Sequence, residues 1–185
     1  MENSFTENNI IKHANQLKGF IQQYDGALFK VPLTVDILGS PPLRKGAIAV
    51  FLPERNFLCK LLGFKDQYAI FTHNLAALMS LGSWQLQATA IHEVRHRFQK
   101  IYPESILTED SVKKHFTPAL LDMIKKDVES YKENAYAYPL EYDAHIMNKV
   151  VWLSQDRSGF IERNILRLIS CNPNTIGDVL TDITS

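Results

Sequence analysis

The segment His92-Glu93-Val94-Arg95-His96 is the part of this chain best suited to chemistry, because it combines two imidazoles with a carboxylate. In a helix, side chains four positions apart lie one turn apart on the same face, so His92 and His96 can both reach one metal ion. Glu93 projects from the neighbouring position and can reach a metal-bound water instead of the metal. This arrangement is typical of a zinc hydrolase, in which the glutamate takes a proton from the bound water.

The residues around this motif predict the helix that it needs. Ser83 is a suitable N-cap and Pro103 lies just beyond the last apolar position, so we predict a helix over residues 84–101. Its buried stripe recurs at helical spacing and consists of Leu86, Ala90, Val94 and Phe98, widened by Ile91 and Ile101. The motif would lie in the middle of this helix, with both histidines on one face.

Upstream of the motif, hydrophobic periodicity predicts a helix followed by short strands. The helix covers residues 5–24 and ends at Asp25-Gly26. Alternating or continuous apolar residues predict strands over 27–38, 46–52 and 68–73, with a short helix over 54–64.

Downstream of the motif, the pattern is mainly helical. Beyond a polar, loop-like segment at 103–117, helices are predicted over 118–133, 139–154 and 158–170, the first of them starting at Thr117-Pro118. A helix, a few strands and then helices indicate an α+β fold, with a small mixed or antiparallel sheet packed on the motif helix and a mostly helical C-terminal half. We predict one domain over residues 1–185.

The composition limits the partners and the cell compartment that we expect. Lys+Arg and Asp+Glu are balanced at 20 each, so nothing indicates a nucleic-acid partner. The polar N-terminus does not resemble a signal peptide, and no apolar stretch approaches the ~18 residues of a membrane span, so we expect no membrane partner. Cys59 and Cys171 form no CxxC pair and favour a reduced, cytoplasmic protein, with one disulfide in an exported protein as the alternative.

A catalytic zinc ion usually takes a third protein ligand, and the predicted helix 139–154 offers the candidates. Glu141 and His145 lie one turn apart, on the face opposite an apolar stripe of Leu140, Ala144 and Met147. Asp143 lies about 200° around the helix from Glu141, so the two carboxylates are poor partners for one ion.

The motif together with Glu141-Tyr142-Asp143-Ala144 resembles the gluzincin branch of zinc metallopeptidases. The compact and ImmA/IrrE-like members often carry a Glu-x-x-Ala pattern on a later helix. The resemblance covers roughly residues 68–150. It implies a zincin-like fold and a zinc ion held by His92, His96 and Glu141, with Glu93 as general base.

The chain departs from this family's pattern in several respects. The 44 residues between His96 and Glu141 exceed the usual compact spacing and imply an inserted helix at 118–133. Arg95 is unusual inside the motif, and its position facing away from the histidines suggests a salt bridge. In the SprT-like alternative the third ligand is a histidine, for which His145 is available, but the glycine that follows in that pattern is absent. We also find no helix-turn-helix, although ImmA/IrrE-like proteins often work near a DNA-binding module.

The segment Tyr68–His73 resembles the strand that runs along the edge of the active-site cleft in gluzincins. Such a strand pairs its backbone with extended substrate and needs little sequence preference. This resemblance is the main reason to expect a peptide or protein substrate.

The remaining chemical role is stabilisation of the oxyanion. The candidates are Tyr102, Tyr136, Tyr138, Tyr142 and His145, and we favour Tyr138 or His145 because they lie close to Glu141 in sequence. We therefore predict a zinc-dependent peptidase. The alternatives are a non-catalytic or latent metal-binding regulatory protein, which a closed fourth coordination position would favour, and a zinc hydrolase of a non-peptide amide.

Overall fold

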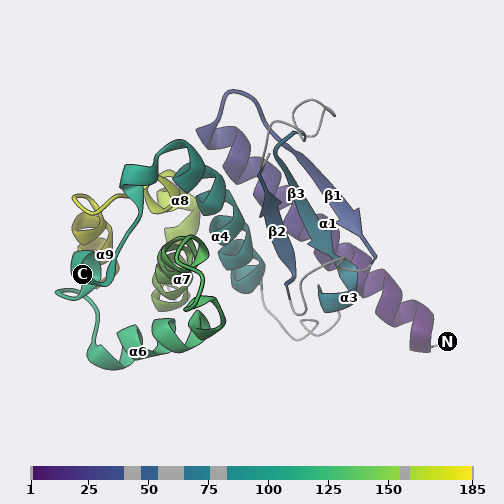
Figure 1. Ribbon diagram of the computed structural model, residues 1–185. Coiled ribbons are helices and arrows are strands. Elements are labelled where there is room, and N and C mark those ends of the chain that lie inside the picture. Colours follow the sequence, from purple (N-terminus) through teal and green to yellow (C-terminus); the bar gives the residue numbers. More distant parts are fainter. Residues whose placement is uncertain (1, 40–46, 54–64, 76–82, 155–158, 185) are drawn as a thin grey trace. The chain divides into compact units, whose positions relative to one another are not determined.

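The computed structural model describes residues 2–39, 47–53, 65–75, 83–154 and 159–184. The chain divides into two compact units, Met1–Val94 and Arg95–Ser185. The division falls inside one continuous helix, α4 (Ser83–Ile101), which therefore contributes residues to both units (Figure 1). A single domain over 1–185 stays a prediction.

The first unit holds a small mixed sheet. Its strands are β1 (Thr34–Leu38), β2 (Ala49–Leu52) and β3 (Gln67–Phe71), in the order β1-β3-β2. β1 runs parallel to β3, and β2 runs antiparallel to it. Helix α1 (Glu2–Leu28) packs on β1 and β3 through a buried stripe of Ala14, Leu17, Ile21 and Tyr24 (Figure 1). The α+β class and the small mixed sheet are as the sequence predicts.

The role predicted for the strand at 68–73 is wrong. Among the described strands β3 is central, because β1 and β2 pair with its two sides, and only β1 and β2 have an outer edge. Residues 68 to 71 are all buried, as expected for a strand covered on both faces, whose sequence is a continuous apolar run. The chain then forms the short helix α3 (Thr72–Leu75) instead of continuing the strand.

The predicted end of the first helix at Asp25-Gly26 is also wrong. α1 continues to Leu28, and β1 begins only at Thr34. Asp25 does not act as a helix terminator because its buried carboxylate accepts hydrogen bonds from the Tyr68 hydroxyl (2.7 Å) and the Leu33 amide (3.1 Å). The helix predicted over 54–64 lies outside the described residues.

The second unit is helical throughout its described residues. After α4 come η2 (Pro103–Ser105), α5 (Glu109–Val112), α6 (Pro118–Asp127), η3 (Glu129–Tyr131), α7 (Ala137–Leu153), α8 (Phe160–Ser170) and α9 (Ile176–Thr184). α7 contacts α6, α8 and α9, and its buried side chains form much of the core of this unit (Figure 1).

The helix starts and ends in this unit follow local chemistry. Thr117 caps α6 as predicted, accepting a hydrogen bond from the Leu120 amide (3.3 Å). The Asn134 side chain accepts from the Ala137 amide (3.0 Å), which starts α7 two residues before Pro139, the predicted start. α6 ends at Asp127, earlier than predicted, and α9 was not predicted.

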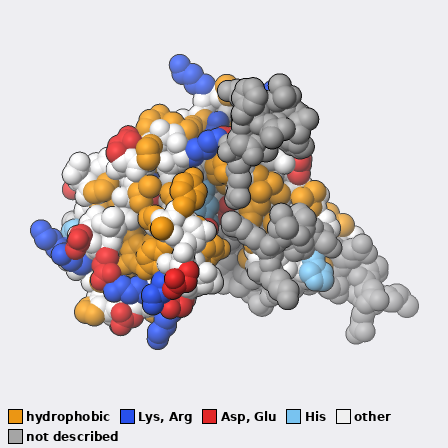
Figure 2. All heavy atoms as spheres, viewed as in Figure 1, with side chains coloured by type: hydrophobic (Ala, Val, Ile, Leu, Met, Phe, Trp, Pro, Cys, Tyr) orange, Lys and Arg blue, Asp and Glu red, His pale blue; other side chains and the backbone are white. Residues whose placement is uncertain are grey.

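The surface of the second unit carries both signs of charge. Figure 2 shows acidic and basic side chains interspersed on this face, and Lys113–Asp110, Lys125–Glu109 and Lys132–Glu129 form exposed ion pairs. None of the described helices combines the length and the apolar character needed to cross a membrane.

Candidate metal centre

Helix α4 presents the motif as the sequence predicts. Its apolar stripe is fully buried at Ala90, Ile91 and Val94, which fixes the rotation of the helix. His92 and His96 are partly exposed and lie one turn apart, whereas Glu93 is buried.

Glu141 on α7 is the carboxylate that lies against these imidazoles. Its Oε2 is 3.6 Å from Nε2 of His96, and its side chain is largely buried. Two donor atoms that are each ~2.1 Å from a tetrahedral zinc ion lie about 3.4 Å apart. The spacing between His96 and Glu141 therefore matches that of two ligands of one ion.

His92, Glu141 and His145 form a group that could hold a metal ion. One ligand atom from each of the three residues lies within 4.8 Å of the others. Imidazole nitrogen and carboxylate oxygen are common zinc ligands, so this donor set fits the predicted cofactor. Glu141 is shared by this group and by the contact with His96. Within the second unit, both His96 and His145 thus lie near Glu141. The sequence suggested His145 as an oxyanion partner and, in the SprT-like alternative, as the third ligand.

Glu93 contacts the edge of the sheet. Its Oε2 accepts a hydrogen bond from the amide of Phe51 on β2 (2.6 Å). The amide of Phe71 donates to the carbonyl of Ile48 (2.8 Å), and hydrogen-bonded pairs alternate along an antiparallel ladder. The amide of Phe51 therefore points away from β3, toward the outer edge of β2. The carboxylate predicted to be the general base is thus beside a strand edge.

His145 also has an acidic neighbour within the second unit. Its Nδ1 is 3.7 Å from Oδ2 of Asp127, and the same oxygen is 2.7 Å from Nζ of Lys149. The 3.7 Å separation is too long for a hydrogen bond, so Asp127 is a nearby negative charge that does not fix the orientation of the His145 ring.

Tyr138, the other predicted oxyanion partner, is in the first turn of α7. Its ring centre is 5.9 Å from that of Tyr142, so the two rings pack on each other. Burial raises the pKa of Tyr142 to about 12, and no described residue hydrogen-bonds its hydroxyl. The side chain of Tyr136 is 80% exposed and faces solvent. The oxyanion role of Tyr138 stays a prediction.

Arg95 forms the salt bridge that its position suggested, and its partner is Asp143. Nε and Nη2 of Arg95 donate to the two carboxylate oxygens at 3.0 and 3.1 Å, and both side chains are fully buried. Nη1 donates to the carbonyls of Ile169 and Cys171 (2.6 and 2.8 Å), and Nη2 also donates to that of Ser105 (2.7 Å). All five N–H donors of the guanidinium are therefore used.

Burial raises the pKa of Asp143, while the Arg95 guanidinium and hydrogen bonds from Gln99 and the Leu107 amide act in the opposite direction. All four of these contacts with Asp143 come from donors, so a protonated carboxyl group would find no acceptor among them. We conclude that Asp143 is ionised and paired with Arg95.

Gln99 is the site residue that sequence reasoning missed. Its side chain lies between His96 and Asp143 and hydrogen-bonds to both. The only sequence signal is its spacing of three residues from His96, which places it on the next turn of the same helix. A glutamine at that position is common on helices, so the spacing alone does not indicate a role.

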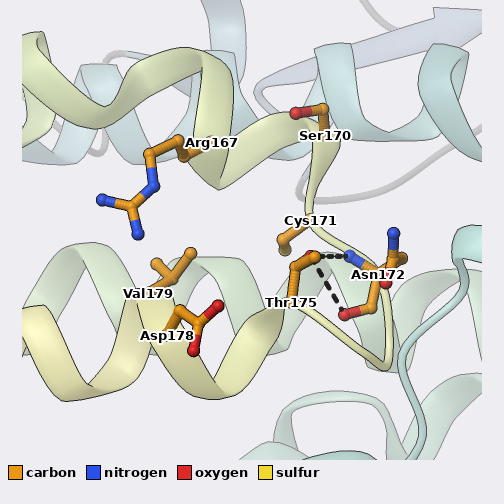
Figure 3. A pocket seen from close by; sticks show the side chains of 7 residues that line it. All are labelled: Arg167, Ser170, Cys171, Asn172, Thr175, Asp178 and Val179. Atoms are coloured by element: carbon orange, nitrogen blue, oxygen red, sulfur yellow. Dashed lines mark hydrogen bonds between the residues drawn. The ribbon is translucent and has the colours of Figure 1, made fainter.

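One described pocket contains none of the proposed metal ligands. It has a volume of about 250 Å³ and opens between the end of α8 and α9 (Figure 3). Its lining consists of Arg167, Ser170, Cys171, Asn172, Thr175, Asp178 and Val179. The side chain of Thr175 is bonded to the backbone of Asn172 within the pocket wall, and no predicted site residue takes part (Figure 3).

No protein-family model, curated protein or solved structure matches this chain. The resemblance to gluzincins therefore rests on the quoted sequence patterns alone.

Proposed function

We propose that this protein is a zinc-dependent metallopeptidase in which His92, His96 and Glu141 hold the ion and Glu93 is the general base. The observation that carries this proposal is that the two buried carboxylates have different local contacts. In the second unit Glu141 lies 3.6 Å from the His96 imidazole, and in the first unit Glu93, next to a proposed ligand on α4, bonds to the Phe51 amide of β2. A structural zinc site needs only the first carboxylate, whereas hydrolysis needs both.

A zinc ion bound here would lower the pKa of a coordinated water towards ~7 and polarise the scissile carbonyl. The residues of the chain supply the other parts. Glu93 accepts the proton of the water and delivers it to the leaving amine, and the Phe51 amide holds its carboxylate in place. Tyr138 or His145 would stabilise the oxyanion.

The edge of β2 supports the peptide part of the proposal, in place of the strand that the sequence suggested. A peptide in extended conformation can add to an exposed strand edge through backbone hydrogen bonds. The outward amide of Phe51 already bonds to Glu93, so a peptide that pairs with the other outward groups of this edge would pass beside the proposed base. The fold would then be zincin-like in its working parts: a motif helix with a strand edge beside it.

The test of this function is the isosteric change Glu93→Gln. Its amide oxygen can still accept from the Phe51 amide, so the contact with β2 is kept while the base is lost. We expect the zinc content of this variant to equal that of the parent. We also expect mass spectrometry to detect no cleavage of a proteome-derived peptide library. The control is Glu104→Gln, a change at an exposed glutamate, which should cleave like the parent. Undiminished cleavage by Glu93→Gln, or loss of its zinc, would contradict the assigned role.

The second candidate is a metal-binding protein with a closed, non-catalytic or latent site. The position of His145 in the metal-capable group favours it, because four protein ligands leave no place for water. X-ray absorption on the zinc-loaded protein separates the two: the peptidase has two imidazoles on the ion, and the closed site has three. Under the closed alternative, His145→Ala would reduce the count by one.

A further inference from the structure

We propose that Gln99 is a positioning residue that holds the neutral His96 ring as its Nδ1–H tautomer and so leaves Nε2 as the nitrogen that binds metal. This inference rests on the proposed metal centre for its purpose. The hydrogen bonds that carry the inference all lie within the second unit. The tautomer of His96 can therefore be tested on metal-free protein.

The hydrogen bonds form a chain from α4 to α7. Nδ1 of His96 is 2.8 Å from Oε1 of Gln99. Nε2 of Gln99 donates to the carbonyl of Leu140 (2.9 Å) and to Oδ2 of Asp143 (2.6 Å). Gln99 is 2% exposed, so water cannot easily replace these partners.

The partners decide which way the glutamine amide faces. The two ends of an amide look alike in shape, and their assignment must come from the hydrogen-bond network. A backbone carbonyl can only accept, so the end of Gln99 that faces Leu140 must be the NH₂ group. The carboxylate of Asp143 also accepts. The oxygen of Gln99 therefore faces His96, and because an amide oxygen cannot donate, Nδ1 of His96 must carry the hydrogen.

This arrangement prepares the other side of the ring. With hydrogen on Nδ1, the lone pair of neutral His96 is on Nε2, the atom that is 3.6 Å from Glu141. The hydrogen bond made by one ring nitrogen sets the state of the other. Arg95 completes the support, because its two bonds to Asp143 fix the carboxylate to which Gln99 is attached.

The direct test is the tautomer of His96, read by long-range proton–nitrogen NMR on metal-free protein at a pH about 2 units above the ordinary pKa of histidine. We expect Nδ1–H in the parent. Gln99→Met keeps the length of the side chain and removes both polar groups, so we expect the Nε2–H population to rise. The matched control is Gln85→Met on the same helix, which should leave the His96 signals unchanged. A parent ring carrying hydrogen on Nε2, or an unchanged tautomer in Gln99→Met, would overturn the inference.

The parent spectrum decides the tautomer even if Gln99→Met fails to fold. Zinc affinity, measured by competition with a coloured chelator, then tests the purpose: Gln99→Met should bind about 10- to 100-fold more weakly than the parent, as is typical when an outer-shell partner of a metal ligand is lost. Equal affinity would overturn the positioning role. A parent that binds no zinc would instead overturn the proposed function, while the tautomer assignment would still be decided by NMR.

Discussion

Arg95–Asp143 and His96–Glu141 are two contacts between the same two helices, α4 and α7, but they are built differently. The first has side chains that are 0% exposed, a 3.0 Å separation and a partner for every guanidinium N–H. The second is 3.6 Å long, with side chains that are 14% and 10% exposed. A saturated, buried pair has no capacity left for a ligand, whereas the looser pair, with the His145 imidazole near Glu141, has donor atoms that an ion could draw together.

Two neighbouring residues of the motif, Arg95 and His96, therefore have different roles. Arg95 holds the helices together, and His96 next to it faces the candidate metal centre. Gln99 connects the two contacts, because it bonds to His96 on one side and to Asp143 on the other. The proposed metal ligand is thus linked through Gln99 to a buried ion pair in which every guanidinium N–H has a partner.

The largest expected effect comes from breaking the saturated pair. Arg95→Met leaves Asp143 as a buried charge without its cation, and three carbonyls lose their donor. We expect a loss of about 3–5 kcal/mol in the free energy of unfolding, measured by urea denaturation of metal-free protein. The double variant Arg95→Met/Asp143→Leu removes both charges and should recover much of that loss. A loss of less than about 1 kcal/mol in Arg95→Met would show that the pair does not hold the helices together.

Breaking the His96–Glu141 contact should weaken zinc binding and leave the stability of the metal-free protein almost unchanged. Glu141→Gln keeps the size of the side chain but removes the charge that a cation needs. We expect zinc affinity to fall by more than the ~10–100-fold typical of outer-shell partners, with little change in the unfolding midpoint of the metal-free protein. Competition with a chelator and urea denaturation measure the two quantities. Large destabilisation with unchanged zinc affinity would reverse the two assignments.

These two contacts also show how much of the candidate site could be predicted from the sequence. Helix α4 was predicted within about a residue of its bounds because a capping serine, a strong apolar stripe and a following proline all agree. Glu141 was predicted as a ligand because its surroundings resemble a family pattern, and this role stays a prediction. The sequence predicted that Asp143 is a poor partner of Glu141 for one ion, and the structure pairs it with Arg95. That bond depends on how α4 and α7 meet, and no local pattern encodes the contact.

The wrong predictions also concern features that depend on tertiary contacts. The apolar run at 68–71 predicts a buried strand equally well at the centre of a sheet or beside a cleft, and only the pairing with β1 and β2 decides. Asp25-Gly26 has the residue types of a helix end, yet the tertiary contacts of Asp25 with Tyr68 and Leu33 override that local preference. Gln99 could not be recognised because its role depends entirely on its neighbours in space.

A smaller effect should be seen at Cys171, whose carbonyl accepts from Arg95. Burial raises the pKa of its thiol to about 12, so the thiolate that reacts with alkylating agents is scarce at pH 8.5. In a Cys59→Ser background, we expect iodoacetamide to modify native protein on the order of 100-fold more slowly than denatured protein. Equal rates would show that the thiol is not buried beside Arg95.

The same pKa shift has a consequence for stability. The thiol of the unfolded chain ionises near its ordinary pKa of 9.0, whereas that of the folded chain ionises only near a pKa of 12. The contribution of this group to stability is therefore fully present below pH 9 and is lost as the pH rises towards 12. The free energy of unfolding should therefore fall as the pH rises from about 9 to 12. Tyr142, whose pKa is raised from 10.0 to about 12, should contribute in the same direction.

The smallest effect is expected where a charge pair is exposed. Lys132 and Glu129 lie 3.2 Å apart with side chains that are 63% and 64% exposed, so water already solvates both. We expect Lys132→Met to leave the melting temperature unchanged within error, in contrast to Arg95→Met. A comparable loss in the two variants would mean that burial and saturation do not distinguish these pairs.

The central claim is that α4 and α7 form a zinc site, and the metal content of the chain purified without chelators tests it most directly. Inductively coupled plasma mass spectrometry should find about one zinc per chain, lost in Glu141→Ala and kept in His145→Ala if three ligands suffice. Absence of zinc in the parent, even after reconstitution with zinc, would contradict the account and remove the basis of the peptidase proposal.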